Sequence, residues 1–180
     1  MAAQGSADRG EPAPSPAVAK VAPVPKPLIV ERLTHHDIPE ICALYKRIFE
    51  PMKNELPPEV LKAWTPSPLE FTSSMEGVTY FAARRDGKLI GAIGCETLDG
   101  ACRLIDLAVD VEHRRQGIAT ALTTAALEWA RHNASRSVWV DALARFEHAA
   151  ALFKHLGFAE AGLLHRHYWN EDVRLFEMAL

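Results

Sequence analysis

The stretch Arg114-Arg115-Gln116-Gly117-Ile118-Ala119 lies between a strand-like run, residues 103–109, and a helix-like run, residues 117–132. The first turn of a helix carries backbone N–H groups that lack intrahelical partners, and the helix dipole adds partial positive charge there. Gly117 lets a ligand approach the backbone closely, and the two arginines add formal charge. The stretch therefore predicts a strand–turn–helix unit that binds phosphate or pyrophosphate. The alternative is a basic helix start on a solvated loop.

The bulk composition describes one packed domain. The chain has 180 residues, a hydrophobic fraction of 48% and a formal net charge of −3, which argues against a nucleic-acid coat or a polybasic membrane binder. No apolar run approaches the roughly 20 residues that cross a bilayer, and the N-terminus lacks the order of a signal peptide, so a cytoplasmic location is expected. Three scattered cysteines are too few for a disulfide framework. Cys95 and Cys102, placed across one hairpin, are expected to be small buried hydrophobic residues.

Residues 1–27 differ from the rest of the chain. They hold seven Ala and six Pro and contain no Leu, Ile or aromatic residue. Such a segment has too little apolar surface to offset the entropy of ordering it. We expect a flexible tail there, followed by one folded domain at 28–180.

Hydrophobic periodicity and turn signals divide residues 28–180 into strands and helices. Asp37 and Glu40 have the form of a capping box before the first helix. Strands are expected at 28–33, 79–84, 88–94, 102–109, 137–143, 159–168 and 173–179, the last two joined by a turn at Asn170–Asp172. Further helices are expected between 51 and 76, at 117–132 and around 149–156. The order β-α-α-β-β-β-α-β-α-β-β predicts an α/β (α+β) fold with a mixed, mostly antiparallel central sheet flanked by helices.

Two motifs resemble the signatures of the GNAT superfamily of N-acetyltransferases. Leu107-Ala108-Val109-Asp110 followed by Arg114-x-x-Gly117-x-Ala119 resembles the acetyl-CoA motif, and Ala149-x-x-Leu152-Phe153-x-x-Leu156-Gly157-Phe158 resembles the second signature. The resemblance covers residues 28–180 and implies the acyl-CoA N-acyltransferase (GNAT) fold. It also implies an enzyme that transfers an acetyl group to a primary amine by direct attack in a ternary complex.

The same resemblance implies acetyl-CoA (coenzyme A) as the cofactor and assigns residues to it. The pyrophosphate is expected at the N–H groups of Arg115, Gln116, Gly117, Ala119 and Thr120, and the pantetheine arm along Leu107, Ala108 and Val109. Arg114, Ile118 and Phe153 are also assigned to cofactor binding. A backbone N–H at Leu107 or its neighbour is expected to polarise the thioester carbonyl. Many family members have a tyrosine where this chain has Phe153, and that tyrosine protonates the departing thiolate. Phenylalanine lacks that proton, so either the thiolate leaves unassisted or another donor serves.

Three side chains are candidates for proton transfer. Asp141 and Asp106 are candidate general bases, because a primary amine is inert while protonated. The segment Val138-Trp139-Val140-Asp141 resembles a strand of bacterial N-terminal protein acetyltransferases, in which a glutamate at this place acts as base. Strand carboxylates at sheet openings also serve merely as hydrogen-bond partners. Tyr168 is the candidate proton donor, and its alternative role is aromatic packing at the rim.

The acceptor class is left open by the sequence. A protein N-terminus, a lysine, a polyamine, a metabolite and an antibiotic are all candidates, with the Asp141 strand and the last hairpin favouring a peptide or protein amine. No nucleic acid or membrane partner is expected, and a homodimer is left open. His165 and His167 alternate onto one strand face, but two histidines without a third ligand give no basis for a metal site. The alternative function is a non-catalytic acyl-CoA-binding sensor or interaction module, suggested by Phe153.

Overall fold

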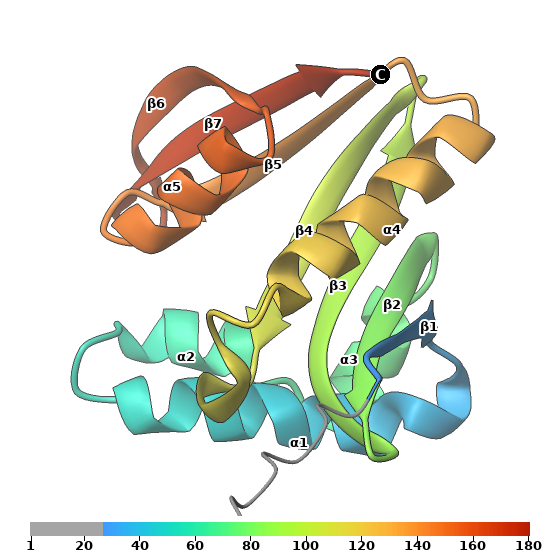
Figure 1. Ribbon diagram of the computed structural model, residues 1–180. Helices are drawn as coiled ribbons and strands as arrows, with labels where there is room; N and C mark the ends of the chain where they lie inside the picture. Colours follow the sequence, from blue (N-terminus) through green and yellow to red (C-terminus); the bar gives the residue numbers. More distant parts are fainter. Residues whose placement is uncertain (1–26) are drawn as a thin grey trace, which may run out of the picture.

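The computed structural model describes residues 27–180, so the expected tail lies, except for Pro27, outside the described residues. These residues form a seven-stranded sheet in the order β1-β2-β3-β4-β5-β7-β6 (Figure 1). The strands are β1 (Ile29–Arg32), β2 (Val78–Arg85), β3 (Lys88–Leu98), β4 (Ala101–Val109), β5 (Ser137–Leu143), β6 (Ala159–Tyr168) and β7 (Glu171–Ala179). Only β4 and β5 run parallel, and the other neighbours are antiparallel. The predicted fold class is confirmed.

Within residues 27–180 the structure has five α-helices. They are α1 (Ile38–Phe49), α2 (Pro58–Trp64), α3 (Pro68–Ser74), α4 (Ile118–His132) and α5 (Glu147–His155), with 3-10 turns at His35–Asp37, Glu50–Met52 and Val111–His113. Helices α1 and α3 pack on one face, and α4 and α5 pack on the other. Helix α2 packs against the ends of β5 and β7. No helix among residues 27–180 is long and apolar enough to cross a bilayer.

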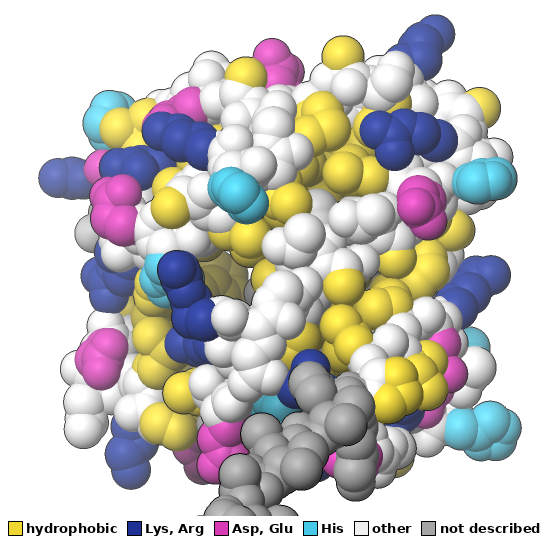
Figure 2. All heavy atoms as spheres, in the orientation of Figure 1, with side chains coloured by type: hydrophobic (Ala, Val, Ile, Leu, Met, Phe, Trp, Pro, Cys, Tyr) yellow, Lys and Arg dark blue, Asp and Glu magenta, His cyan; other side chains and the backbone are white. Residues whose placement is uncertain are grey.

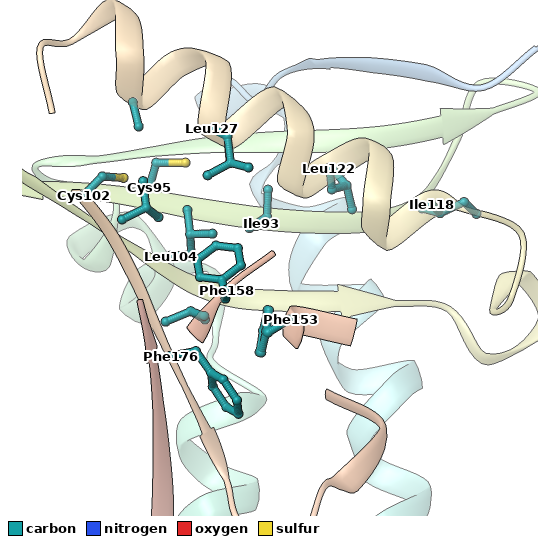
Figure 3. Packing of buried hydrophobic residues seen from close by; sticks show 14 of the residues in the cluster. Ile93, Cys95, Cys102, Leu104, Ile118, Leu122, Leu127, Phe153, Phe158 and Phe176 are labelled. Carbon is teal, nitrogen blue, oxygen red and sulfur yellow. The ribbon is translucent and has the colours of Figure 1, made fainter. Parts of the chain in front are cut away.

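The core under α4 explains why this segment is helical. Ile118, Leu122, Ala126 and Ala130 recur every four residues and are almost fully buried against Ile93 and Leu104 of the sheet (Figure 3). Ala125 and Trp129 lie half-buried. Cys95 and Cys102 are buried and free, as is Cys42.

The start of α1 differs from the expected capping box. The carboxylate of Asp37 accepts from the Thr34 backbone N–H at 2.8 Å, and Glu40 accepts from the Leu89 N–H at 2.9 Å. Both carboxylates also bind the guanidinium of Arg84 at 2.6 Å. The capping box is therefore formed three residues earlier, between Thr34 and Asp37, while a distant arginine and a strand amide engage the carboxylate of Glu40.

The chain reversals follow turn chemistry. Asp86 and Gly87 both have positive φ, 56° and 75°, as a two-residue hairpin turn requires. Helix α5 ends at Gly157, where the Gly157 and Phe158 N–H groups bind the Lys154 and Phe153 carbonyls, a Schellman motif. The last hairpin turns at Trp169-Asn170 rather than at 170–172, because Glu171 already pairs with Tyr168.

The parallel pairing of β4 and β5 is short, and this shapes the site. It runs from Ala101 opposite Ser137 to Leu104 opposite Val140 and then stops. Beyond it β5 continues along β7, while β4 continues along β3. Figure 1 shows the two strands separating toward the α1 and α2 side of the molecule. The sheet is therefore split into two halves by a wedge-shaped opening.

Candidate functional site

The loop before α4 has a backbone shaped for an anion. Arg115 and Gly117 have φ of 60° and 77°, whereas Arg114 has φ of −65°, and Gln116 is absent from the positive-φ residues. The extended Arg114 and the left-handed Arg115 and Gly117 bend the chain sharply just before α4, so the N–H groups of the loop lie at a helix N-terminus. Arginine in the left-handed region is strained, and such strain is often kept where a binding loop needs it.

The N–H groups of this loop are free to bind a ligand. Those from Arg115 to Thr120 donate to no other group within residues 27–180, and the first satisfied one is that of Ala121, which binds the Gly117 carbonyl at 2.9 Å. A Cβ on Gly117 would meet nothing within 4 Å, so the space beside it is open. These donors at a helix start, with Arg114 and Arg115 exposed beside them, fit a diphosphate group.

Side chains brace the loop in this shape. Gln116 accepts from Arg85 Nη1 at 2.5 Å and donates to the Glu112 carbonyl at 3.3 Å. Arg114 Nε donates to the Val109 carbonyl at 3.2 Å. The loop is thus tied to the end of β2 on one side and to the end of β4 on the other.

The opening between β4 and β5 continues from this loop. Ala108 and Val109 pair with β3 alone, Leu107 lies in the irregular stretch just before them, and none of the three pairs with β5, so this edge of β4 faces the opening. Figure 2 shows the surface hollowed between α5 and the start of α4, with hydrophobic side chains at the bottom. Burial, and then the charge of Arg114 in the loop before α4, lower the pKa of His148 near the start of α5. An extended ligand that is bound at the loop can therefore hydrogen-bond along the unpaired edge of β4.

Asp106 occupies a β-bulge within β4. Gly94 pairs with Ile105 and Ala92 with Ala108, so Ile93 faces two residues, and Asp106 takes a φ of 54°. Its carboxylate accepts from the Tyr80 hydroxyl at 2.6 Å, and its carbonyl accepts from the Tyr45 hydroxyl at 3.1 Å. The bulge turns the carboxylate and the following N–H away from the regular ladder.

The proton affinity of Asp106 is raised. The residue reaches the surface of the opening, but protein surrounds its carboxylate on most sides. This desolvation raises the pKa above the usual value, although the Tyr80 hydrogen bond and the charge of Arg103 act to lower it. The electrostatics therefore suit a carboxylate that accepts a proton.

Asp141 has a different environment. It is half-buried on β5, and its Oδ1 accepts from Nη2 of Arg103 at 2.9 Å. The same Nη2 lies 3.1 Å from the Tyr168 hydroxyl, and the guanidinium carbon lies 4.8 Å from the centre of the Trp139 ring. The carboxylate of Asp141 is therefore already engaged by an arginine, whereas that of Asp106 accepts from a neutral hydroxyl.

Asp141 and Tyr168 both lie beside Arg103, and Asp106, which accepts from Tyr80, lies near enough for the charges of Arg103 and Asp141 to act on it. Sequence reasoning missed Arg103 and Tyr80. The signal for Arg103 was an arginine inside the strand that precedes the Arg114–Ala119 stretch. No signal identified Tyr80, because its strand reads as an ordinary hairpin partner.

Phe153 lies in the core rather than at an open edge. It is 3% exposed, and its ring packs 5.8 Å from Phe158 and 5.6 Å from Phe176. Phe146, the N-cap residue of α5, packs 5.9 Å from Trp64 of α2 and so links the two halves of the molecule. Neither residue carries a titratable proton.

The far side of the opening is framed by α2 and the last hairpin. Val60 packs with Leu143 and Val173, and Tyr168 lies at the edge of this cluster. Arg145 donates to the Glu55 carbonyl at 2.7 Å and to the Glu171 carboxylate at 2.6 Å, and so ties the loop before α2 to β7. A separate hollow of about 460 Å³ between α1 and residues 61–70 contains none of the predicted site residues.

Comparison with known proteins agrees with this geometry. Residues 38–158 match the profile of the acetyltransferase (GNAT) family. Human N-acetyltransferase 8 is 34% identical over 108 residues, 57% of this chain and 48% of that protein. The ribosomal protein bS18-alanine N-acetyltransferase of Escherichia coli (strain K12) is 31% identical over 105 residues, 57% of this chain and 70% of that protein.

The fold also matches solved structures. The PaiA N-acetyltransferase of Thermoplasma acidophilum, a complex with coenzyme A, has a TM-score of 0.73 at 12% identity, over 86% of this chain and 99% of that one. At this identity the likeness concerns the fold. The chain spans about half the length of the human and mouse relatives that it matches.

Proposed function

Because the chain belongs to the acetyltransferase (GNAT) family, we propose that it transfers the acetyl group of acetyl-CoA to a primary amine. The observation that carries the proposal is the run of free N–H groups from Arg115 to Thr120, placed at the end of the opening between β4 and β5. An anion site alone has many uses. An anion site that leads into a split sheet suits a long ligand with a diphosphate at one end.

The residues would divide the work as follows. The loop N–H groups hold the diphosphate, and each charge-assisted bond contributes about 1.5–3 kcal/mol. The free edge at Leu107–Val109 holds the extended arm, and the N–H after the bulge at Asp106 polarises the thioester carbonyl. Acetyl-CoA, when bound, supplies an activated acetyl group. The protein otherwise contributes positioning and proton transfer.

We propose Asp106 as the general base, directly or through one water. At pH 7 removing a proton from a lysine amine costs about 4.6 kcal/mol, and from an α-amine about 1.4 kcal/mol. Asp106 reaches the opening and has a raised pKa, whereas Asp141 is paired with Arg103. Asp141 remains the alternative base.

The departing thiol requires a proton or must leave as a thiolate. Tyr168 is our proposed donor because its hydroxyl lies at the opening, 3.1 Å from Nη2 of Arg103. A thiol with a pKa of about 8.5 also leaves without help near neutral pH. Replacing Tyr168 with phenylalanine separates the two routes, because the unassisted route loses no rate.

For the acceptor we propose a peptide or protein α-amine. Its deprotonation is the less costly one, and the E. coli relative is named for an alanine of a ribosomal protein. A second candidate function, a non-catalytic acyl-CoA-binding module, is favoured by Phe153, which fills the place of the expected tyrosine and lies in the core.

The test combines binding with turnover. Coenzyme A should raise the melting temperature, and a panel of peptides, lysine and polyamines should reveal thiol release from acetyl-CoA. Asp106→Asn should lower kcat at least tenfold, and Asp141→Asn should lower it less. Tight coenzyme binding without turnover on any amine favours the sensor. Coenzyme A that neither binds nor protects the protein contradicts both functions.

A further inference from the structure

Arg103 is held along one edge only. Its Nε and Nη2 lie 3.3 and 2.9 Å from Asp141 Oδ1, and Nη2 also reaches the Tyr168 hydroxyl. The plane of the group packs against Trp139. Nη1 donates to no group within residues 27–180, and the side chain is 29% exposed. A rigid guanidinium therefore presents two unused donors beside the opening.

The surroundings of Arg103 carry negative charge. Burial acts most strongly and lowers the pKa of Arg103, but the hydrogen bond and charge of Asp141, together with the charges of Tyr168 and Glu96, outweigh it. The pKa of Arg103 is therefore raised. Asp106 lies close enough for the charge of Arg103 to lower its pKa. An ammonium group is thus attracted to the carboxylates, while the free edge of Arg103 suits an oxygen acceptor.

We propose that Arg103 is the specificity residue of the acceptor site and binds the carbonyl oxygen next to the reacting amine. An α-aminoacyl group carries an ammonium and a carbonyl two bonds apart, which matches a carboxylate beside a guanidinium edge. A lysine side chain or a polyamine has no oxygen at that distance, so the donors of Nη1 remain unpaired when it binds. The inference rests on the proposed function, which it deepens by naming the α-aminoacyl acceptor.

Arginine is better suited than lysine to this double role. One edge of the guanidinium is used by Asp141, and the second edge stays in the same plane for the ligand. A lysine ammonium at this position keeps the charge opposite Asp141 but loses the fixed second edge. Arg103→Lys therefore removes carbonyl recognition without leaving Asp141 unpaired, and Arg103→Met removes both.

The activity test measures the ratio of two rates. One peptide has a free α-amine and no lysine. The other has an acetylated N-terminus and differs in sequence only by one lysine, which carries its single amine. Both Arg103→Lys and Arg103→Met should lower the ratio of kcat/KM for α-amine over ε-amine at least tenfold, with the KM for acetyl-CoA unchanged. Arg136→Met, an exposed arginine at the far end of β5, should leave the ratio unchanged. An unchanged ratio in both Arg103 variants overturns the inference.

A binding test decides the inference without turnover. Alaninamide and isopropylamine share a carbon skeleton around the amine, but only the first has a carbonyl. At pH 6.5, where both are cations, titration into the protein–coenzyme A complex, followed by NMR, should show at least tenfold tighter binding of alaninamide. Arg103→Lys should remove this difference. Equal affinity in the wild-type protein, or a difference that persists in the variant, refutes the inference. If the wild-type protein acetylates no amine, the proposed function fails, and this binding result still decides the role of Arg103.

Discussion

The hydrogen bond from Tyr80 to Asp106 gives a quantitative prediction for the pH dependence of catalysis. The Tyr80 hydroxyl donates to the carboxylate at 2.6 Å from a side chain that is 1% exposed. This bond stabilises the charged form, so its loss in Tyr80→Phe raises the pKa of Asp106. A hydrogen bond to a charged group contributes about 1.5–3 kcal/mol, which corresponds to about one to two pKa units. Because Asp106 also reaches water, we expect the lower end, about one unit.

The assay is kcat/KM for a peptide α-amine, measured from pH 5 to 9. A base must be deprotonated to act, so activity falls as the pH drops below its pKa. The acid limb of the profile, in which kcat/KM falls as the pH decreases, should therefore move about one pH unit toward higher pH in Tyr80→Phe, as the bond strength above requires. The acceptor amine contributes the same ionisation to both profiles, and the difference between them isolates the enzyme.

Tyr45→Phe is the matched control for this measurement. Its hydroxyl also lies beside Asp106 but donates to the backbone carbonyl at 3.1 Å rather than to the carboxylate. The control should leave the acid limb within a few tenths of a unit, because the carboxylate loses no donor. An unmoved limb in Tyr80→Phe, or equal shifts in both variants, refutes Asp106 as the base.

Three further predictions concern the loop and the core. Gly117→Ala should weaken coenzyme A binding at least tenfold. Gly87→Ala is the control, because Gly87 has a similar positive φ and open space around it, so this variant should lose the same stability, about 1 kcal/mol, but bind coenzyme A normally. Isothermal titration compares the two variants, and equal binding by both contradicts the loop assignment. Burial acts to raise the pKa of Asp110, but the hydrogen bond and charge of Arg47 hold it below the usual value. The ion pair therefore contributes to the unfolding free energy above about pH 4, and this contribution disappears as the pH falls further. Asp110→Asn should therefore destabilise the protein by about 1–2 kcal/mol in urea unfolding at pH 7 and by less at pH 3, and an equal loss at both values would show that charge plays no part. Leu122→Ala empties a fully buried position under α4 and should reduce the unfolding free energy by about 2–5 kcal/mol, and a smaller loss would mean that the core closes around the cavity.

The sequence predicted what local patterns determine. The alternating strands, the Asp86-Gly87 turn and the glycine at the end of α5 follow from residue preferences within a few positions. The expected pairing of Asp37 with Glu40 was wrong, because Asp37 caps the turn that begins at Thr34 and Glu40 binds Leu89 and Arg84. Arg84 lies more than forty residues from both carboxylates, so local spacing gave no sign of its contacts.

The candidate site was predictable in its parts but not in its pairings. Asp106, Asp141 and Tyr168 were found because their residue types and strands suit the chemistry. The bulge at Asp106 could not be read from the sequence, because it is set by the register between β3 and β4. Arg103 pairs with Asp141 across 38 positions, a contact that depends on how far the parallel pairing of β4 and β5 extends.

The short parallel ladder has a mechanical consequence. Four residue pairs, ending at Leu104 and Val140, are the backbone connection between β4 and β5. Beyond them the two half-sheets are bridged by side chains, such as the ring contacts of Trp64 with Phe49 and Phe146. A ligand that hydrogen-bonds along residues 107–109 and also contacts β5 would restrict the motion of the two half-sheets relative to each other. Amide hydrogen exchange in β5 and β7, distant from the loop before α4, should then slow when this ligand is bound.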